Sequence, residues 1–460
     1  MKDQQKYGLR IFLLLLAVVV FACSDFVDIE PPRNEIIRQS VFTDDASATS
    51  AVMGIFSEMA NPNNGFINGT SSSVYVLCGF SGDEFIPNST NVFFDNTILA
   101  DNSTVLNYLW KPAYSYIHYS NAVLEGIEGS TSLSEEVQRQ LEGEAKVIRA
   151  LSYFYLVNLF GDVPIITTTN FEINRVATRD PIEQVYQQII TDLQDAKELL
   201  AADYSFSNGE RVRPNKGVAE ALLARIYLFT ENWGDAESQA TIVINDGKYH
   251  LSSDLNEVFL ANSEEAIWQL KPVNINNTLE AQYFMPSSGT NTPFASLTES
   301  LLNTFEEGDM RFMDWVGDVT PITETFYFPF KYKIRDTSVP SSEYSMICRL
   351  AEQYLIRAEA RARQGNEKGA LEDINKVRNR AGLGDSSANT REEILDVIMQ
   401  ERRVELFSEG AHRWLDLKRT DRIDEVLGPI KPNWQPTDAF YPIPQKEREA
   451  NPSLTQNEGY

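Results

Sequence analysis

Two segments of the sequence share one helical pattern, and this repeat constrains the fold more than any other feature. In each copy, small or apolar residues recur at offsets of 12, 16 and 19 residues, with a polar turn between two amphipathic runs. The two sets are Ala224, Ala236, Ala240 and Val243, and Ala358, Ala370, Ile374 and Val377. Small side chains at these places let two antiparallel helices approach closely, and such hairpins must stack to bury their apolar faces. The repeat therefore predicts a stacked array of helical hairpins, with two unrelated hairpins as the alternative.

Other parts of the chain carry the same helical period. Apolar residues at intervals of three or four predict helices over 144–160, 182–200, 394–407 and 413–421. Between the helical regions lie two segments, 61–103 and 272–340, that are rich in Asn, Ser, Thr, Gly, Pro and aromatic residues. We call them the first and second insertions, and expect them to contain short strands at most and to form the working surface. The predicted fold class is mostly α.

The charge balance and the cysteine count argue against several classes of function. The 460 residues include 40 Lys and Arg against 66 Asp and Glu, and the net charge of −26 repels the phosphates of nucleic acids. The three cysteines and three widely spaced histidines form no metal-ligand pattern, and the sequence has no GxSxG or phosphate-loop motif. We therefore expect no nucleic-acid partner, no metal, no cofactor and no enzymatic activity.

The N-terminus has the features of a secretory signal. Three basic residues precede an apolar run over 11–22, which at 12 residues is too short to span a bilayer. The run ends in Val20-Phe21-Ala22-Cys23, which resembles the junction where bacterial lipoproteins are cleaved and acylated on the cysteine. We predict a signal peptide over 1–22, lipidation of Cys23 with fatty acids such as palmitate, and attachment to the membrane by the lipid alone.

An ordered set of stretches resembles the SusD/RagB family of nutrient-binding outer-membrane lipoproteins of Bacteroidetes. The set comprises the lipoprotein start, 144–164 with its ending Phe160-Gly161-Asp162-Val163-Pro164, 216–249, 349–382, 401–410, 414–419 and the closing Tyr441-Pro442-Ile443-Pro444. The resemblance implies a scaffold of four tetratricopeptide-like helical hairpins with long irregular ligand-binding insertions. It also implies that the protein caps a SusC-like TonB-dependent β-barrel transporter and presents a ligand, usually an oligosaccharide, to it.

The same resemblance suggests a cellular location for the protein and a division of the mature chain into two regions. Asp25, Asp28 and Glu30 lie close behind the anchor, and resemble the acidic signal that sends such lipoproteins to the outer face of the outer membrane. Residues 23–225 and 226–460 are expected to be the N-terminal and C-terminal regions of the family, packed together as one globular unit.

Sugar binding requires flat apolar surfaces for the rings, and amides, carboxylates or guanidinium groups for paired hydroxyls. Both insertions supply these groups. The ligand-binding candidates are Asp83, Asn91 and Phe93 in the first insertion, and Tyr283, Arg311, Trp315 and Tyr327 in the second, with Asn88 and Gln282 among their neighbours. Any single aromatic residue is more often packed in the core than in contact with a ligand. Trp315 is the strongest candidate for a ligand contact.

The charged residues near the C-terminus allow a second interpretation. Glu401, Glu405 and Asp416 resemble the carboxylates of a glycosidase, but they fall on helices full of apolar residues, so we expect ion pairs and caps. Carboxylates that folding brings together leave no sequence signal. Two functions stay open: a glycan-binding lipoprotein, or a surface lipoprotein lid that binds peptides or another nutrient.

The lipoprotein interpretation predicts the behaviour of a single substitution. Cys23→Ala should abolish lipidation and release the protein from the membrane fraction, because one residue carries every acyl chain. Metabolic labelling with an alkyne fatty acid measures this directly. Label retained by the Cys23→Ala protein would contradict the prediction.

Overall fold

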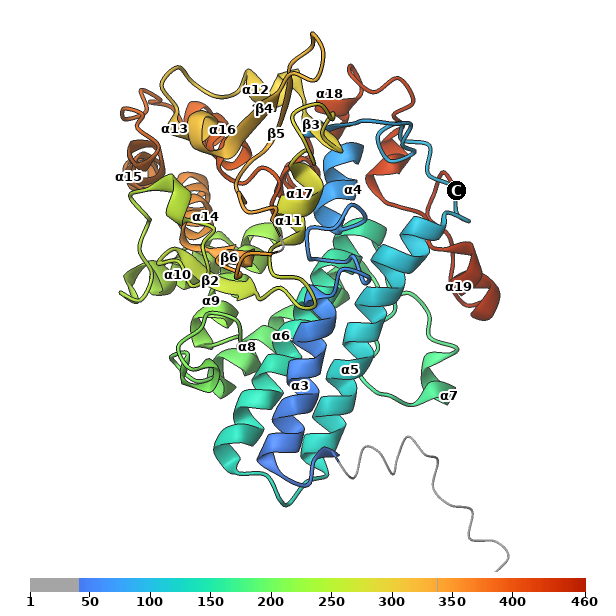
Figure 1. The fold of residues 1–460 in the computed structure, drawn as a ribbon. Coiled ribbons are helices and arrows are strands. Elements are labelled where there is room, and N and C mark those ends of the chain that lie inside the picture. Colours follow the sequence, from blue (N-terminus) through green and yellow to red (C-terminus); the bar gives the residue numbers. More distant parts are fainter. Residues whose placement is uncertain (1–40, 337) are drawn as a thin grey trace, which may run out of the picture.

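The computed structural model describes residues 41–336 and 338–460, and helices dominate it (Figure 1). The helices are α3 (Asp45–Ala60), α4 (Val74–Ser81), α5 (Lys111–Glu128), α6 (Glu135–Phe160), α7 (Phe171–Asn174), α8 (Ile182–Leu199), α9 (Lys216–Phe229), α10 (Trp233–Asn245), α11 (Leu279–Phe284), α12 (Glu299–Leu302), α13 (Met310–Trp315), α14 (Leu350–Arg363), α15 (Glu367–Arg380), α16 (Arg391–Glu405), α17 (His412–Arg419), α18 (Ile423–Leu427) and α19 (Gln445–Ala450). The strands are β1 (Phe85–Pro87), β2 (Ala266–Leu270), β3 (Ala295–Leu297), β4 (Val316–Val319), β5 (Phe326–Pro329) and β6 (Ser345–Arg349). The predicted mostly α fold class is confirmed.

Both predicted hairpins are present, as α9 with α10 and α14 with α15. The small residues of the repeat are completely buried where the paired helices meet. In the second hairpin, Gly365 takes a left-handed φ of 81° at the turn, and Asn366 caps α15 by accepting a hydrogen bond from the Gly369 amide at 3.0 Å. In the second hairpin, the glycine and the capping asparagine therefore fix where α14 ends and α15 begins.

The hairpins belong to a longer array. In chain order, α5 packs on α6, α6 on α8, α8 on α9, α9 on α10, α10 on α14, α14 on α15 and α15 on α16. Each of these helices buries its apolar face against the next, as in repeat proteins. Figure 1 shows α3, α5 and α6 side by side at one end of the molecule, and the second insertion at the other.

The long predicted helices occur with shifted ends. The helix predicted over 144–160 begins nine residues earlier, at Glu135, because two acidic residues in its first turn favour the helix N-terminus. The helix predicted over 182–200 is α8, and those predicted over 394–407 and 413–421 are α16 and α17. The prediction that the insertions contain short strands at most was wrong. The second insertion contains the short helices α11, α12 and α13, and the first contains α4, whose eight residues are all buried, so α4 shows no amphipathic period.

Short strands connect the two insertions. Strand β1 from the first insertion pairs antiparallel with β3 from the second, with Phe85 opposite Leu297 and Pro87 opposite Ala295. Within the second insertion, β4 pairs with β5, which contains the predicted alternating run. Segments about 200 residues apart in the sequence therefore form one surface.

A single large apolar cluster extends through the described chain. It contains residues from Phe42 to Leu454, and α9 crosses the predicted boundary between residues 225 and 226.

Cys78 and Cys348 are buried free thiols, and Cys23 lies outside the described residues. Among the helices of the described part, none is both long and apolar enough to cross a membrane.

Charged side chains fill the space between the second insertion and the C-terminal helices. Arg349 lies 2.6 Å from Glu405, 2.7 Å from Glu265 and 2.8 Å from Glu409, and all four side chains are buried. Glu405 also pairs with Arg380, and with Arg311 at 3.1 Å. Burial would raise the pKa of Glu405, but these three guanidinium groups hold it well below its usual range. We call this set the Glu405 network; the expectation of inter-helix ion pairs here is confirmed.

Loss of one cation from the Glu405 network should destabilise the protein strongly. Arg349→Met is expected to lower the free energy of unfolding by about 3–5 kcal/mol, because it leaves buried carboxylates without a partner. Arg175→Met is the matched control, since its pair with Glu172 is at the surface, with the two side chains 51% and 71% exposed. The control should cost less than about 1 kcal/mol. Urea unfolding of both variants checks the prediction, which equal costs would contradict.

Candidate ligand-binding site

A groove of about 640 Å³ opens where the two insertions meet. One wall contains Asn88 from the first insertion, and the remainder comes from the second insertion. The lining residues are Asn88, Gln282, Tyr283, Met285, Pro286, Ser287, Thr290, Asn291, Thr292, Phe294, Pro321, Ile322 and Arg335. We call it the insertion groove. Its volume is in the range of small-molecule sites, and its polar lining groups are amides, hydroxyls and one guanidinium.

The pairing of β1 with β3 brings the two walls together. Directly after β1, the backbone amide of Asn88 donates a hydrogen bond to the carbonyl of Phe294 at 3.2 Å. Thr298, directly after β3, donates from its hydroxyl to the carbonyl of Asp83 at 2.7 Å. The short sheet is thus extended by a hydrogen bond at each end, and it places Asn88 and Phe294 side by side in the groove.

Helix α11 presents the groove's aromatic residue. Thr278 caps the helix, whose inner face buries Leu279, Glu280, Ala281 and Phe284, while Gln282 and Tyr283 lie on its half-buried side. Pro286 follows the helix end and cannot continue it. The ring of Tyr283 meets the edge of Phe294, with centroids 6.2 Å apart and planes at 66°. Tyr283 is therefore held by a neighbouring ring and partly exposed in the groove.

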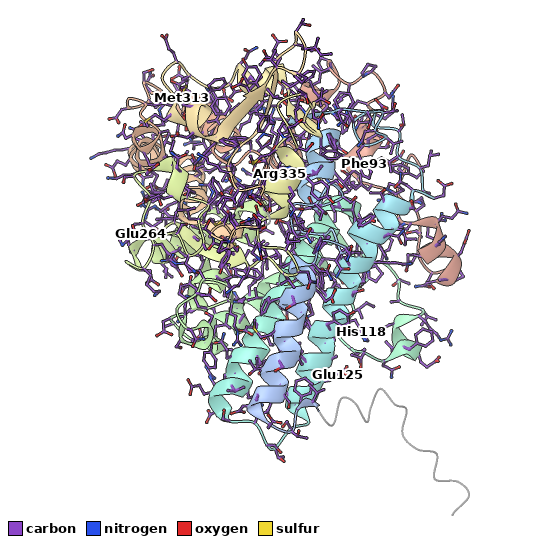
Figure 2. The ribbon with its side chains drawn as sticks, in the orientation of Figure 1. Phe93, His118, Glu125, Glu264, Met313 and Arg335 are labelled. Atoms are coloured by element: carbon purple, nitrogen blue, oxygen red, sulfur yellow. The ribbon has the colours of Figure 1, made fainter. Side chains whose placement is uncertain are left out.

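Polar groups are held in fixed positions around the Tyr283 ring. The Nε of Arg335 donates to the carbonyl of Met285 at 3.2 Å, which orients the guanidinium beside α11 (Figure 2). Asn291 donates from its side-chain amide to Ser287 at 2.6 Å. Below α11, burial raises the pKa of Glu280 to about 7, and Ser345 donates to its carboxyl at 2.8 Å. Amide, hydroxyl and guanidinium groups both donate to and accept from a hydroxyl-rich molecule.

Of the seven predicted ligand-binding residues, Tyr283 lines the insertion groove. Tyr327 is half-buried on β5, where its ring packs on Phe312 with centroids 6.1 Å apart. It does not line the groove, although Pro321 and Ile322 from the turn before β5 do. Ile322 is 90% exposed and forms the rim.

The structure corrects the expectation for Trp315, which is completely buried. Its indole nitrogen donates to the carbonyl of Leu255 at 3.0 Å, and its ring meets Phe259 with centroids 5.5 Å apart. The ammonium of Lys331 lies 4.8 Å from the ring centroid. A ring enclosed on all sides has no face to offer a sugar, so we assign Trp315 to the core of the second insertion.

Arg311 and Asp83 are also internal. Arg311 is completely buried and pairs with Asp309 at 2.8 Å and with Glu401 at 2.9 Å, as part of the Glu405 network. Asp83 is 2% exposed and pairs with Arg403 and Arg413, each at 2.7 Å. Burial would raise the pKa of Asp83, but the two arginines lower it. Both charges stabilise the scaffold and do not reach the groove.

The remaining two candidates shape the loop after β1. Phe93 is 3% exposed, and its ring meets the edge of Tyr441 with centroids 5.6 Å apart. The side-chain oxygen of Asn91 accepts hydrogen bonds from the amides of Phe93 at 2.9 Å and Phe94 at 3.3 Å. Phe93 belongs to the core, and Asn91 forms a local turn.

Sequence analysis missed Asn291, Phe294 and Arg335 as lining residues. No local pattern marks them, because each reaches the groove through the pairing of β1 with β3 or the path of the chain after β5. The neighbours Asn88 and Gln282 do line the groove. In the described ranges 41–336 and 338–460, no cluster of three or more His, Cys, Asp or Glu side chains is arranged to hold a metal ion.

Comparisons with known proteins place the chain in a family. A family model described as starch-binding and associating with the outer membrane matches residues 26–228, and the model of the SusD family matches residues 317–460. The SusD-like protein P25 of Formosa agariphila is 26% identical over 98% of this chain and 99% of its own length. The starch-binding protein SusD of Bacteroides thetaiotaomicron is 24% identical over 74% of this chain and 76% of its own length.

Solved structures share the fold along most of the chain. A SusD superfamily protein from Bacteroides vulgatus has a TM-score of 0.79 at 21% identity, covering 91% of this chain and all of that one. A laminarin-binding SusD-like protein has a TM-score of 0.78 at 23% identity, with the same coverage. The surface glycan-binding protein A of Bacteroides thetaiotaomicron, in complex with laminarihexaose, has a TM-score of 0.75 at 20% identity and covers 90% of this chain. The two family models and these full-length similarities establish that the chain belongs to the SusD/RagB family.

Proposed function

We propose that this protein is a surface-exposed outer-membrane lipoprotein that binds oligosaccharides in the insertion groove. It delivers them to a SusC-like TonB-dependent β-barrel transporter. The observation that carries the proposal is the groove itself, in which an aromatic ring, several amides and Arg335 converge from two distant segments.

The chemistry of the lining suits a neutral, hydroxyl-rich ligand. Tyr283 offers part of an aromatic face to the C–H groups of a sugar ring. Asn88, Gln282 and Asn291 each offer one donor group and one acceptor, the pairing that adjacent sugar hydroxyls require. Side-chain amides are not acids or bases near neutral pH, so these three residues support a binding role and not a catalytic one.

The relatives support the same class of ligand. Three of the proteins named above are described as binding starch, laminarin or glycans, and one of those structures contains laminarihexaose. Laminarin and starch oligosaccharides are therefore the first ligands to test. The alternative ligand is a peptide or another nutrient, which would use the same groove, and a ligand panel distinguishes these classes.

The anchor supports the partnership with a transporter. The lipidation site at Cys23, outside the described residues, would attach the protein to one face of the membrane. A ligand held by such a protein still has to cross the outer membrane, so a pore-forming partner is required. The family resemblance supports a TonB-dependent barrel as that partner.

The groove predicts how two substitutions change affinity. Tyr283→Ala and Arg335→Ala should each weaken binding of a recognised oligosaccharide by about 1–3 kcal/mol, or roughly 5- to 150-fold. Titration calorimetry against a panel of laminarin and starch oligosaccharides measures the change. Melting temperatures should change little, because both side chains are partly exposed.

Matched controls make the test specific. Tyr119→Ala removes a tyrosine that is 43% exposed on α5, and Arg175→Ala removes an exposed arginine near α7. Both should bind like the unmodified protein. If Tyr283→Ala and Arg335→Ala keep full affinity for every recognised glycan, the insertion groove is not the site; if peptides bind and no glycan does, the ligand class is wrong.

The partnership makes a separate prediction. The protein should be recovered together with an outer-membrane β-barrel when it is purified from native membranes in mild detergent. Mass spectrometry of the purified complex identifies the second component. Repeated recovery as a lone monomer under gentle conditions would contradict the partnership and leave glycan binding unaffected.

A further inference from the structure

The amides and hydroxyls of the insertion groove suit the uncharged part of a sugar chain, and Arg335 remains as the one charged group among the lining residues. No Asp or Glu of the described chain lines the groove, although acidic residues outnumber basic ones in the sequence by 66 to 40. A guanidinium in a partly enclosed site without a carboxylate creates a local region of positive potential. The insertion groove is therefore electrostatically unlike the chain as a whole.

One part of the Arg335 guanidinium is fixed by the protein and another part is free. The side chain is half-buried in the groove lining, and its Nε donates to the carbonyl of Met285 at 3.2 Å (Figure 2). Among the described residues, none accepts a hydrogen bond from the two terminal nitrogens. These two nitrogens form the edge with which arginine binds a carboxylate or a sulfate through two parallel hydrogen bonds. The Met285 contact therefore orients the guanidinium and leaves its anion-binding edge open.

The carboxylates in the segments around Arg335 do not neutralise it. Asp336 accepts a hydrogen bond from a backbone amide at 2.8 Å, and Glu343 accepts two from backbone amides at 2.7 and 3.1 Å. Glu280 is buried beneath α11, and Glu324 is exposed in the turn that carries the rim, outside the groove lining. Within residues 41–336 and 338–460, no carboxylate forms an ion pair with Arg335, so its charge is available to a ligand.

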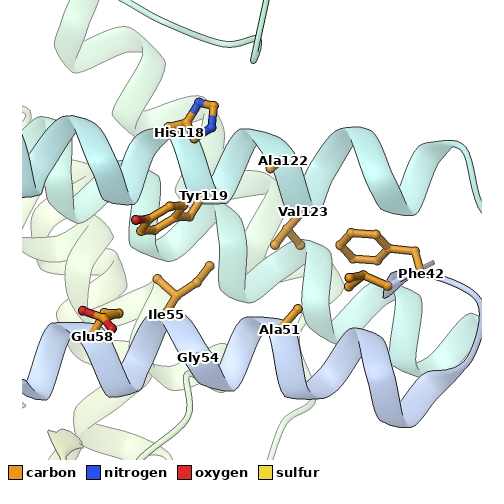
Figure 3. Close-up of a pocket in the computed structure, with 10 residues that line it drawn as sticks. Phe42, Ala51, Gly54, Ile55, Glu58, His118, Tyr119, Ala122 and Val123 are labelled. Carbon is orange, nitrogen blue, oxygen red and sulfur yellow. The ribbon is translucent and has the colours of Figure 1, made fainter. Parts of the chain in front are cut away.

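Two other grooves differ from the insertion groove in charge. A groove of about 520 Å³ between α3 and α5 has the carboxylate of Glu58 in its lining and no lysine or arginine (Figure 3). A third groove, beside α7, has Lys111 and Arg175 in its lining together with the carboxylate of Glu447. Arg175 also pairs with Glu172 at 2.6 Å. In both grooves a carboxylate in the lining opposes an acidic ligand.

The overall charge limits how many acidic groups the ligand carries. A net charge of −26 repels a polyanion, and this repulsion acts over about 8–10 Å at moderate ionic strength. A single anionic group in direct contact with Arg335 gains an ion pair with two hydrogen bonds, which exceeds the screened repulsion from more distant carboxylates. Uncharged sugar units beside it still find the amides of Asn88, Gln282 and Asn291.

Building on the glycan-binding function proposed above, we propose that the oligosaccharide in the insertion groove carries a single acidic group that binds the terminal nitrogens of Arg335. The acidic group is the carboxylate of a uronic acid or a sulfate ester, and the other units of the oligosaccharide are neutral. Arg335 is then the residue that selects the acidic glycan, because an ion pair forms with that ligand and not with its neutral counterpart.

Matched forms of one oligosaccharide test the proposal. Laminarihexaose and the hexasaccharide of starch are each prepared with one modified unit, at either end or in the middle, as the uronate, its neutral methyl ester or the sulfate ester. Titration calorimetry on the mature chain carrying Cys23→Ala measures each affinity. An acidic form should bind about 10- to 100-fold tighter than the methyl ester, because hydrogen bonds between charged groups are the stronger ones. Comparison of uronate with sulfate identifies which anion the groove takes.

Substitutions assign the preference to Arg335. Arg335→Gln should bring the affinity ratio of acidic form to methyl ester to about one, and Arg335→Glu should invert it, since a carboxylate there repels the anion. The matched control is Arg175→Gln, which removes a paired cation from the groove beside α7 and should leave the ratio unchanged. Melting temperatures of all three variants confirm that they fold.

The failure of this proposal is distinct from failure of the proposed function. Equal affinity for the acidic forms and the methyl ester overturns the selection of an acidic glycan and leaves glycan binding intact. A preference that survives Arg335→Gln also overturns it, because another cation then provides the preference. Binding of peptides with no binding of any form of either glycan overturns the proposed function itself.

Discussion

The buried carboxylate of Glu405 is the contact on which the rest of the arrangement depends. It lies at the end of α16 and binds guanidinium groups from three other elements, Arg311 on α13, Arg349 on β6 and Arg380 on α15. Removing these charges from water costs several kcal/mol each, and the cost is offset only while every partner stays in place. The second insertion is therefore fixed to the helical array by charge and not by apolar packing alone.

The first insertion is attached to the same region. Asp83, two residues before β1, binds Arg403 on α16 and Arg413 on α17. Both walls of the insertion groove are thus held by ion pairs to α16, although their sequences are about 200 residues apart. A groove held in this way is shaped before its ligand arrives, which reduces the ordering that binding would otherwise require.

The sequence predicted the scaffold better than the site, for a physical reason. Long helices carry a repeated apolar period, so α8 and the two hairpins could be located from the spacing of apolar residues alone. Helix α4 is buried on all sides and has no such period. Trp315 was misassigned because a polar insertion can build a small core of its own, here with Phe259. The lining of the groove depends on the pairing of β1 with β3, a long-range contact that no local pattern encodes.

The separation of scaffold and lining has an evolutionary consequence. Residues 286–292 and the rim at Ile322 belong to loops that follow α11 and link β4 to β5, and most of them are exposed. Substitutions, insertions or deletions there would leave the Glu405 network and the helical array intact, since loops tolerate such changes at little cost to the fold. Descendants of one ancestral chain could therefore come to bind different ligands by altering a few loop positions while keeping the same core.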